Sequence, residues 1–251
     1  MTEAAALLGE LSELAGATLG PRLGRGPSSD SWRLQRGAQA LVLRMDRPLV
    51  KALGLSRANE VRCQQRAAQQ QLAPQLVFAD PERGILVSHY VPEPTIHAEA
   101  RRAPAYLRKV GRLLAAVHAI KAADLPTMDL PAILNRYATC AGTPVADRRA
   151  RSLSDQARDL YRDAPWYLCH HDPHLLNVRA ARCLIDWEYA ALGDPLFDLA
   201  ALLAQESLTD EARAALFEGW GQPIDGPRLA EFSVLYQGVA ELWEAAISAV
   251  S

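Results

Sequence analysis

The stretch that decides the fold reads Leu168-Cys-His-His-Asp-Pro-His-Leu-Leu-Asn-Val178 and continues with Cys183-Leu-Ile-Asp-Trp-Glu-Tyr189 and Gly193-Asp-Pro-Leu-Phe-Asp198. The polar residues in these three pieces fall at turns between short apolar runs. This pattern favours a broken, β-like region over Tyr167–Asp186 rather than a helix. The residue types that carry chemistry are concentrated in this region.

Two short strands, around Val178 and around Leu184, would form a hairpin that returns Asp186 to the same cleft as Asn177. Phosphoryl transfer needs a carboxylate near the attacking hydroxyl, and oxygen ligands that hold Mg²⁺ on the phosphates of a nucleotide. Asp172, Asn177 and Asp186 supply that set. The sequence therefore predicts a phosphate centre in this cleft.

The same segment resembles the family of aminoglycoside phosphotransferases and choline kinases, which are distant relatives of the protein kinases. The spacing His170-x-Asp172-x-x-x-x-Asn177 and the block Ile185-Asp186-Trp187-Glu188-Tyr189 carry the resemblance. In motif style the chain is closest to bacterial choline/ethanolamine and thiamine kinases. The resemblance implies a base or hydroxyl-orienting residue at Asp172, Mg²⁺ ligands at Asn177 and Asp186, and supports of the catalytic loop at His170 and Asp198.

The N-terminal half agrees with this resemblance. Gly24-x-Gly26-Pro-Ser28-Ser29 resembles the family's phosphate-covering loop, where small residues let the backbone approach a nucleotide. Arg44 matches the position of the phosphate-binding lysine of kinases, and Glu60 would be its ion-pair partner; Ser88 and Tyr90 fall in the segment that meets adenine. ATP and Mg²⁺ are the implied cofactors. A plain β-turn and an ordinary surface ion pair are the alternatives.

The expected fold class is α+β with the two lobes of a protein kinase. The N-terminal lobe, 1–92, would bind the nucleotide with a small β-sheet and a helix; the larger, mainly helical lobe, 93–251, would hold the catalytic loop and the acceptor pocket. Pro92-Glu-Pro94 stiffens the chain between them. In the first lobe we expect a helix over 1–14, strand, flexible loop and strand over 19–43, a helix over 56–72, and a hairpin of 75–79 with 85–91.

Helical spacing dominates the second lobe. Leu107, Val110, Leu114 and Val117 recur as expected for a helix that lays one face on the core. Further helices are expected over 147–161, 196–205, 210–217 and 228–249.

The acceptor pocket is expected between the catalytic loop and the C-terminal helices. Aromatic faces attract quaternary ammonium groups through cation–π interactions. We therefore expect choline, ethanolamine or a thiamine-like alcohol as the acceptor, with a sugar, an amino sugar or an aminoglycoside as the alternative. A plain core role is the competing interpretation for the aromatic residues. The candidate wall residues are His174, Glu188, Tyr189, Trp220, Tyr236 and Trp243.

The composition, 49% hydrophobic and 22% charged, is that of an ordinary globular protein. A formal net charge of -2 provides no basic excess for a nucleic-acid partner, and no apolar run is long enough to insert into a membrane. The start lacks a signal-peptide pattern, so we expect a cytoplasmic monomer or homodimer. The four cysteines form no Cys-x-x-Cys pair and are expected to be reduced and mostly buried.

Two other classes of function remain as alternatives. His170, His171, Asp172 and His174 together could suit Zn²⁺ or Fe²⁺ in a metal-dependent hydrolase. That hypothesis leaves Asn177 and the block around Asp186 unexplained. A nucleotide-binding protein without catalysis is the second alternative. His97 and His118 are expected to be packing or surface residues rather than ligands.

Overall fold

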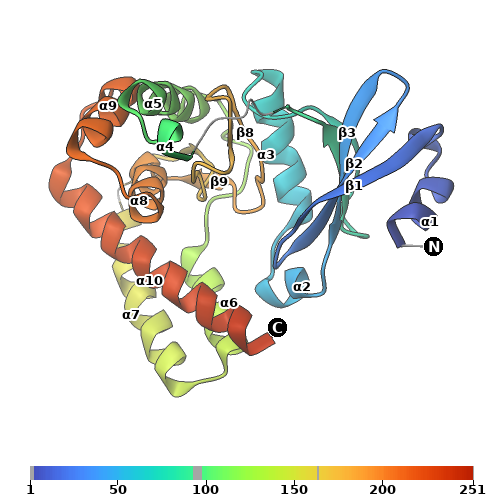
Figure 1. Ribbon diagram of the computed structural model, residues 1–251. Helices are drawn as coiled ribbons and strands as arrows, with labels where there is room; N and C mark the ends of the chain where they lie inside the picture. The colour runs from blue at the N-terminus through green and yellow to red at the C-terminus, as the bar shows by residue number, and fades with distance from the viewer. Residues whose placement is uncertain (1–2, 93–97, 163, 251) are drawn as a thin grey trace.

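The computed structural model describes residues 3–92, 98–162 and 164–250. Its N-terminal part is a sheet with helices, and its C-terminal part is mainly helical (Figure 1). Helix α3 lies between the sheet and the C-terminal helices. The fold is thus α+β, as the sequence predicts. The predicted division at 92/93 falls at the edge of the described residues, and His97 lies outside them. The expectations for both stay predictions.

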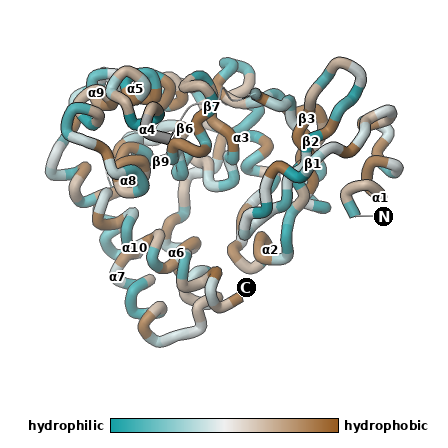
Figure 2. Tube along the Cα trace, in the orientation of Figure 1, coloured by the Kyte–Doolittle hydropathy of each residue, from teal (hydrophilic) through white to brown (hydrophobic). Residues whose placement is uncertain are grey.

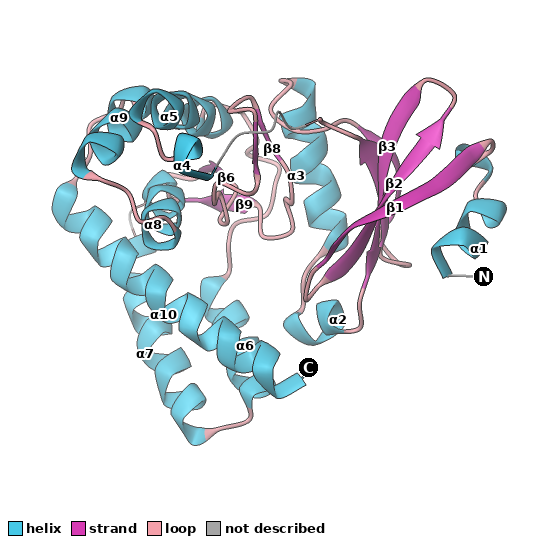
Figure 3. Cartoon of the chain, viewed as in Figure 1, coloured by secondary structure: helices cyan, strands magenta, loops and turns pink. Residues whose placement is uncertain are grey.

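The N-terminal sheet is antiparallel, with five strands in the order β1-β2-β3-β5-β4. Figure 3 shows β1, β2 and β3 side by side in this sheet. The elements are α1 (Glu3–Glu10), the 3-10 helix η1 (Ser12–Leu14), β1 (Ala17–Arg25), β2 (Ser29–Arg36), β3 (Gln39–Asp46), α2 (Leu49–Leu53), α3 (Arg57–Gln69), β4 (Leu76–Asp80) and β5 (Ile85–His89). The expected helices near the N-terminus and over 56–72 and the expected hairpin of β4 and β5 are confirmed. Helix α2 was not expected.

Alternation along the strands gives the sheet two different faces. Leu34, Leu41 and Leu43 are fully buried and pack with Leu7 of α1 on one face. Because successive side chains of a strand point to opposite faces, Arg44 lies on the other face, toward α3 and the helical part.

The prediction of one strand, a loop and one strand over 19–43 was wrong in one respect. The chain makes three strands there, because a second turn follows β2 at Gly37, whose φ of 56° suits a glycine. The polar sequence of β2, Ser-Asp-Ser-Trp-Arg-Leu-Gln-Arg, concealed this middle strand. The glycine loop is consequently the tight connection of a β1–β2 hairpin.

The C-terminal part packs helices around two small strand pairs, β6 with β9 and β7 with β8. Helices expected over 147–161, 196–205, 210–217 and 228–249 are present. The elements are α4 (Ala98–Arg101), α5 (Pro104–His118), α6 (Leu130–Ala141), α7 (Pro144–Tyr161), β6 (Tyr167–Cys169), β7 (Val178–Arg179), β8 (Cys183–Leu184), β9 (Ala191–Gly193), α8 (Pro195–Gln205), α9 (Asp210–Trp220) and α10 (Gly226–Val250).

Helix α6 was missed at the sequence level. Proline normally breaks a helix, but it is tolerated in the first turn, where Pro131 stands. The Asp129 side chain caps this helix by accepting a hydrogen bond from Ala132 N at 3.1 Å, and Gly142 ends it at φ 64°. Each long helix carries both hydrophilic and hydrophobic residues (Figure 2). Within the described residues, no helix is both long and apolar enough to cross a membrane.

Candidate active site

The β7–β8 hairpin that the sequence predicts is present, directly after the loop that carries Asp172. Val178 pairs with Leu184, and Ile185 N donates a hydrogen bond to the Asn177 carbonyl at 2.9 Å. This link brings the segment that carries Asp186 alongside the one that carries Asn177. Asp186 has a φ of 65°, a conformation that costs a non-glycine residue energy and is concentrated at functional sites.

Asp172 lies in the loop between β6 and β7, held by neighbouring side chains. Its Oδ1 accepts a hydrogen bond from Gln205 Nε2 at 2.9 Å, and its Oδ2 lies 3.6 Å from His174 Nε2. Asn177 Nδ2 donates to the Asp172 carbonyl at 3.0 Å. Sequence reasoning missed Gln205, because an exposed glutamine at the end of a helix belongs to no motif and no spacing rule singles it out.

Asp198 fixes the start of the catalytic loop. Its two carboxylate oxygens accept hydrogen bonds from His170 N at 2.9 Å and His171 N at 2.7 Å. Burial opposes ionisation of this carboxyl, but the hydrogen bond from His118 and the nearby positive and polar groups lower its pKa to about 2. Asp198 is therefore a fixed anion under the loop, and its predicted supporting position agrees with these contacts.

The two loop histidines are neutral parts of the structure. Burial lowers the pKa of His170, whose Nε2 donates to the Ile185 carbonyl at 2.9 Å and whose ring packs edge-on against Trp187. Burial also lowers the pKa of His171 to about 4, and its ring packs against Phe197. His170 thus ties the loop to the segment before Asp186.

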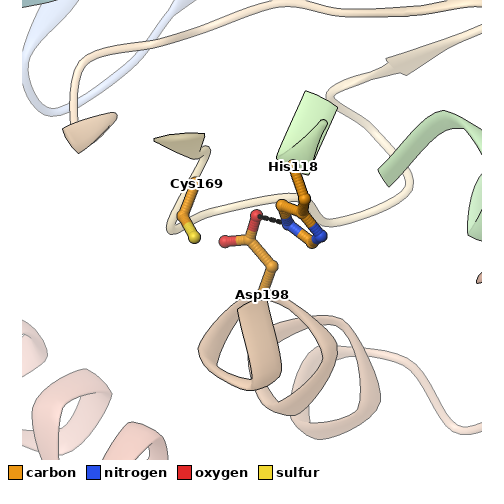
Figure 4. Close-up of side chains that lie close together, drawn as sticks. All are labelled: His118, Cys169 and Asp198. Carbon is orange, nitrogen blue, oxygen red and sulfur yellow. Dashed lines mark hydrogen bonds and ion pairs between the residues drawn. The ribbon is translucent and has the colours of Figure 1, made fainter. Parts of the chain in front are cut away.

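His118, Cys169 and Asp198 come close together beneath the loop (Figure 4). His118 Nε2 donates to Asp198 at 3.0 Å, and His118 Nδ1 accepts from Trp220 Nε1 at 3.2 Å. Burial raises the pKa of the Cys169 thiol well above its usual value. With both imidazole nitrogens engaged and the thiol neutral, this cluster is a hydrogen-bonded brace and not a metal site.

The hydrolase alternative finds no support in this geometry. In the part of the chain that the structure describes, His170, His171, Asp172 and His174 do not place their ligand atoms around one point. His171 Nε2 is turned toward Gly193, where an added Cβ would come within 2.5 Å of it.

The predicted partner of Arg44 is in place. Arg44 Nη2 lies 2.5 Å from Glu60 Oε1, and its Nη1 lies 3.1 Å from Asp186 Oδ1. This arginine therefore connects the sheet, α3 and the segment after β8. Burial, together with the charges of Glu60 and Asp172, raises the pKa of Asp186, while Arg44 opposes that rise.

The glycine loop is a tight turn that contacts the C-terminal part of the chain. Gly26 N donates to the Ser29 carbonyl at 2.8 Å, and an added Cβ at Gly24 would meet Ser31 Oγ at 3.3 Å. Ser28 is buried, and its hydroxyl donates to Glu188 Oε1 at 3.2 Å. The predicted loop residues Gly24, Gly26, Ser28 and Ser29 thus form one compact turn.

Ser88 and Tyr90 stand at the end of β5, beside β3. Ser88 is a buried sheet residue in register with Val42, and Tyr90 N already donates to the Ala40 carbonyl at 2.9 Å. The adenine-binding role of this segment stays a prediction.

Two of the predicted acceptor-wall residues lie elsewhere. Trp220 points to His118 under the catalytic loop, because α9 packs closely on α5. Glu188 faces the N-terminal part, where its Oε2 lies 3.0 Å from Arg57 Nη1. Burial and the Asp186 charge raise the pKa of Glu188 to about 7, against the opposing effect of Arg44 and Arg57. Neither residue lines the cavity beside Asp172.

A cavity of about 500 Å³ adjoins Asp172 between α6, α8 and α10. Trp243 Nε1 donates to the Tyr189 hydroxyl at 2.9 Å across it, and burial keeps the pKa of Tyr189 well above its usual value. Two aromatic lining residues were not predicted from the sequence. Tyr137 lies on α6, a helix that was not expected, and Phe197 lies on α8 without a motif that marks it as a wall residue. The aromatic lining consists of Tyr137, Tyr189, Phe197, Tyr236 and Trp243, and the polar lining includes His171, Asp172, His174, Gln205, Glu241 and Glu244.

The phosphate centre has the ligand chemistry that Mg²⁺ prefers. Asn177 and Asp186 offer a carbonyl and a carboxylate oxygen on adjoining segments. Around this centre, two arginines, Arg44 and Arg57, pair with four carboxylates, those of Asp46, Glu60, Asp186 and Glu188, so the acidic side chains outnumber their partners. A divalent cation would relieve that imbalance, so the residues present fit Mg²⁺.

Comparisons with known proteins agree with this geometry. Residues 20–232 match the model of the phosphotransferase enzyme family. Protein LicA of Haemophilus influenzae is 32% identical over 98 residues, which cover 37% of this chain and only 29% of that protein. The chain thus spans less than a third of the length of this curated relative.

Solved structures share the fold. A choline/ethanolamine kinase family protein from Mesorhizobium loti superposes with a TM-score of 0.74 at 24% identity, over 96% of this chain and 84% of that one. Choline kinase LicA from Streptococcus pneumoniae gives a TM-score of 0.75 at 17% identity, over 96% of this chain and 89% of that one. A structure of LicA in complex with AMP gives a TM-score of 0.76 at 17% identity, over 98% of this chain and 89% of that one. Because the family match covers residues 20–232, most of its length, the chain belongs to the phosphotransferase enzyme family.

Proposed function

We propose that this phosphotransferase moves the γ-phosphoryl group of ATP to the hydroxyl of a small cationic alcohol such as choline, ethanolamine or a thiamine-like compound. The observation that carries the proposal is the cavity of about 500 Å³ whose aromatic walls adjoin Asp172. Aromatic faces favour a cationic group, and Glu241 and Glu244 add negative charge to the lining. The likeness to LicA and to choline/ethanolamine kinase structures supports the same choice.

In the proposed reaction, Asp172 receives the acceptor hydroxyl and directs its oxygen toward the γ-phosphorus. Its Oδ1 accepts a hydrogen bond from Gln205 at 2.9 Å, while its Oδ2 accepts a longer one from Asn177 Nδ2 at 3.4 Å, so Oδ2 is the oxygen proposed to take the hydroxyl proton. Asn177 and Asp186 would hold Mg²⁺, which when bound neutralises charge on the nucleotide phosphates. Arg44 would donate to a phosphate, because its guanidinium already points into the centre at Asp186.

Asp198 and His170 keep this arrangement in place without touching the reactants. Asp198 holds the two loop amides before Asp172, and His170 holds the Ile185 carbonyl before Asp186. Alignment supplies much of the rate in phosphoryl transfer, so these contacts are part of the proposed mechanism. A cytoplasmic location is part of the same proposal, because the proposed reaction needs a supply of ATP.

The test is a product assay with purified protein, ATP and Mg²⁺ against choline, ethanolamine, thiamine, amino sugars and aminoglycosides. A phosphomonoester of a cationic alcohol, absent with Asp172→Asn, is the expected result. Turnover of an amino sugar or aminoglycoside alone would replace the proposed acceptor class. ATP binding without any product across the panel would contradict the proposed reaction and favour a nucleotide-binding role.

A further inference from the structure

Arg57, at the first position of α3, is the most heavily engaged charged side chain at the junction between the sheet and the helical part. It is 7% exposed. Its Nε donates to both carboxylate oxygens of Asp46 at 2.9 Å, and its Nη1 lies 2.8 Å from Glu60 Oε2 and 3.0 Å from Glu188 Oε2. One guanidinium thus joins three carboxylates from the end of β3, from α3 and from the segment after β8.

Two of these carboxylates, those of Glu188 and Asp46, connect Arg57 to the glycine loop. Glu188 accepts a hydrogen bond from the Ser28 hydroxyl at 3.2 Å. Asp46 precedes Arg47, whose N donates to the Ser28 carbonyl and whose Nη1 donates to the Gly26 carbonyl, both at 2.8 Å. Arg57 therefore braces the loop from two sides, through Glu188 and through the end of β3.

The third carboxylate, that of Glu60, connects Arg57 to Arg44. Glu60 divides its oxygens between the two arginines, with Oε1 toward Arg44 and Oε2 toward Arg57. Without Arg57, Glu60 would be free to turn fully onto Arg44 and draw it away from a phosphate.

The balance of charge in this ion-pair network also makes Arg57 important for binding a triphosphate. Arg44 and Arg57 face four acidic side chains, those of Asp46, Glu60, Asp186 and Glu188. Removing one of two cations from a buried network leaves carboxylates unpaired and repels an incoming triphosphate. The site tolerates its acidic excess only while Arg57 neutralises the carboxylates nearest the glycine loop.

We propose that Arg57 is a positioning residue for the nucleotide: it sets the glycine loop and the Arg44–Glu60 pair in the geometry that receives the triphosphate. The proposal rests on the proposed ATP site but not on the identity of the acceptor. A lysine cannot replace this role fully, because an ammonium group is a single point of charge and cannot span three carboxylates as a planar guanidinium does.

Helix α3 offers a matched control. Arg66 also joins α3 to the helical part, with its Nη2 2.9 Å from Asp124 Oδ2 and its Nη1 donating to the Lys121 carbonyl at 2.7 Å. This contact lies away from the phosphate centre. If Arg57 merely attached α3 to the helical part, Arg66→Gln would have the same consequences as Arg57→Gln.

The experiment measures binding of ATP with Mg²⁺ by calorimetry for the wild type, Arg57→Gln, Arg57→Lys and Arg66→Gln, with the unfolding temperature of each as a check of folding. We expect Arg57→Gln to weaken ATP binding by at least about tenfold, Arg57→Lys to weaken it less, and Arg66→Gln to bind as the wild type does. AMP, which lacks the outer phosphates, should lose much less affinity in Arg57→Gln.

Two results would overturn the proposal: unchanged ATP affinity in a folded Arg57→Gln or Arg57→Lys protein, or an equal loss for AMP and ATP. If Arg57→Gln does not fold, Arg57→Lys decides alone. Failure of the wild type to bind ATP would instead contradict the proposed function, so the two failures are distinguishable.

Discussion

At the scale of single residues, the sequence predicted which side chains come together where a motif fixes both residue type and spacing. Asp172, Asn177 and Asp186 come together because a two-residue strand pair returns the chain on itself. Glu188 shows the limit of such inference. It was predicted to face the acceptor, but the direction of its side chain depends on Arg57, which is distant in sequence and pairs with it at 3.0 Å.

His171 gives a prediction on pH. Burial lowers its pKa from 6.5 to about 4 in the folded protein, so the unfolded chain binds its proton first as the pH falls. The stability from the neutral imidazole is therefore fully present above pH 6.5 and is lost toward pH 4, by up to about 3 kcal/mol.

His171→Asn is the matched variant, because asparagine tolerates the left-handed backbone at this position, with φ 64°, and does not titrate. Urea unfolding between pH 7 and pH 4 should show a shallower loss of stability for the variant than for the wild type. If the free energy of unfolding falls equally with pH in the variant and the wild type, the predicted difference in His171 protonation between the folded and unfolded chains is wrong.

Trp243 gives a prediction on specificity. Its indole lines the cavity beside Asp172, the proposed acceptor site, and its Nε1 donates a hydrogen bond to the Tyr189 hydroxyl. Trp243→Leu should raise KM for a cationic acceptor by roughly tenfold, as expected for a lost cation–π contact, and should leave KM for ATP near the wild-type value. Initial-rate kinetics with each substrate varied in turn separate the two effects. A shift in KM for ATP alone would place Trp243 outside the acceptor site.

At the scale of elements, helix interiors were predicted better than helix starts. Helix α7 was expected from residue 147, but it begins at Pro144 after Thr143, whose side chain accepts a hydrogen bond from Ala146 N at 3.1 Å. Helix α6 has a similar cap and a proline in its first turn, and it was missed altogether. The cavity could not be foreseen in full, because α6 supplies Tyr137.

The contact between α5 and α9 gives a prediction on packing. An added Cβ at Gly111 would come within 2.1 Å of the Leu216 carbonyl oxygen, a backbone atom that cannot move aside alone. Gly111→Ala should lower the free energy of unfolding by about 2 kcal/mol or more, because overpacking forces the helices apart. Gly9→Ala in α1 is the control, since nothing lies within 4 Å of an added Cβ there. The midpoints of urea unfolding are compared for Gly111→Ala and Gly9→Ala. Equal midpoints would contradict the close contact between α5 and α9.

At the scale of the whole molecule, the predicted phosphate centre lies where the sheet meets the helical part. Arg44 of β3 contacts Asp186, and Arg57 of α3 contacts Glu188. The two-part α+β fold was predictable, because strand signals give way to helical periodicity along the chain. The ion pairs across the junction were not, because no local pattern indicates which arginine meets which carboxylate.

Because both parts contribute to the proposed nucleotide site, ATP with Mg²⁺ should stabilise the molecule as one unit. At a free concentration of 100 times Kd, the expected gain is about 2.7 kcal/mol. Thermal unfolding should show a rise in Tm with ATP and Mg²⁺, and EDTA should remove most of it. Asp186→Asn should lose the Mg²⁺-dependent share of the rise; the same rise in this variant would contradict the metal role of Asp186.

The central claim is that Asp172 serves the transfer step itself. The most direct measurement compares Asp172→Asn with the wild type, using phosphomonoester formation for turnover and calorimetry for ATP binding, with the best acceptor of the panel. We predict a loss of turnover of at least about a hundredfold with nearly unchanged ATP affinity, because the amide keeps the shape but cannot take the hydroxyl proton. Wild-type turnover by Asp172→Asn would contradict the account.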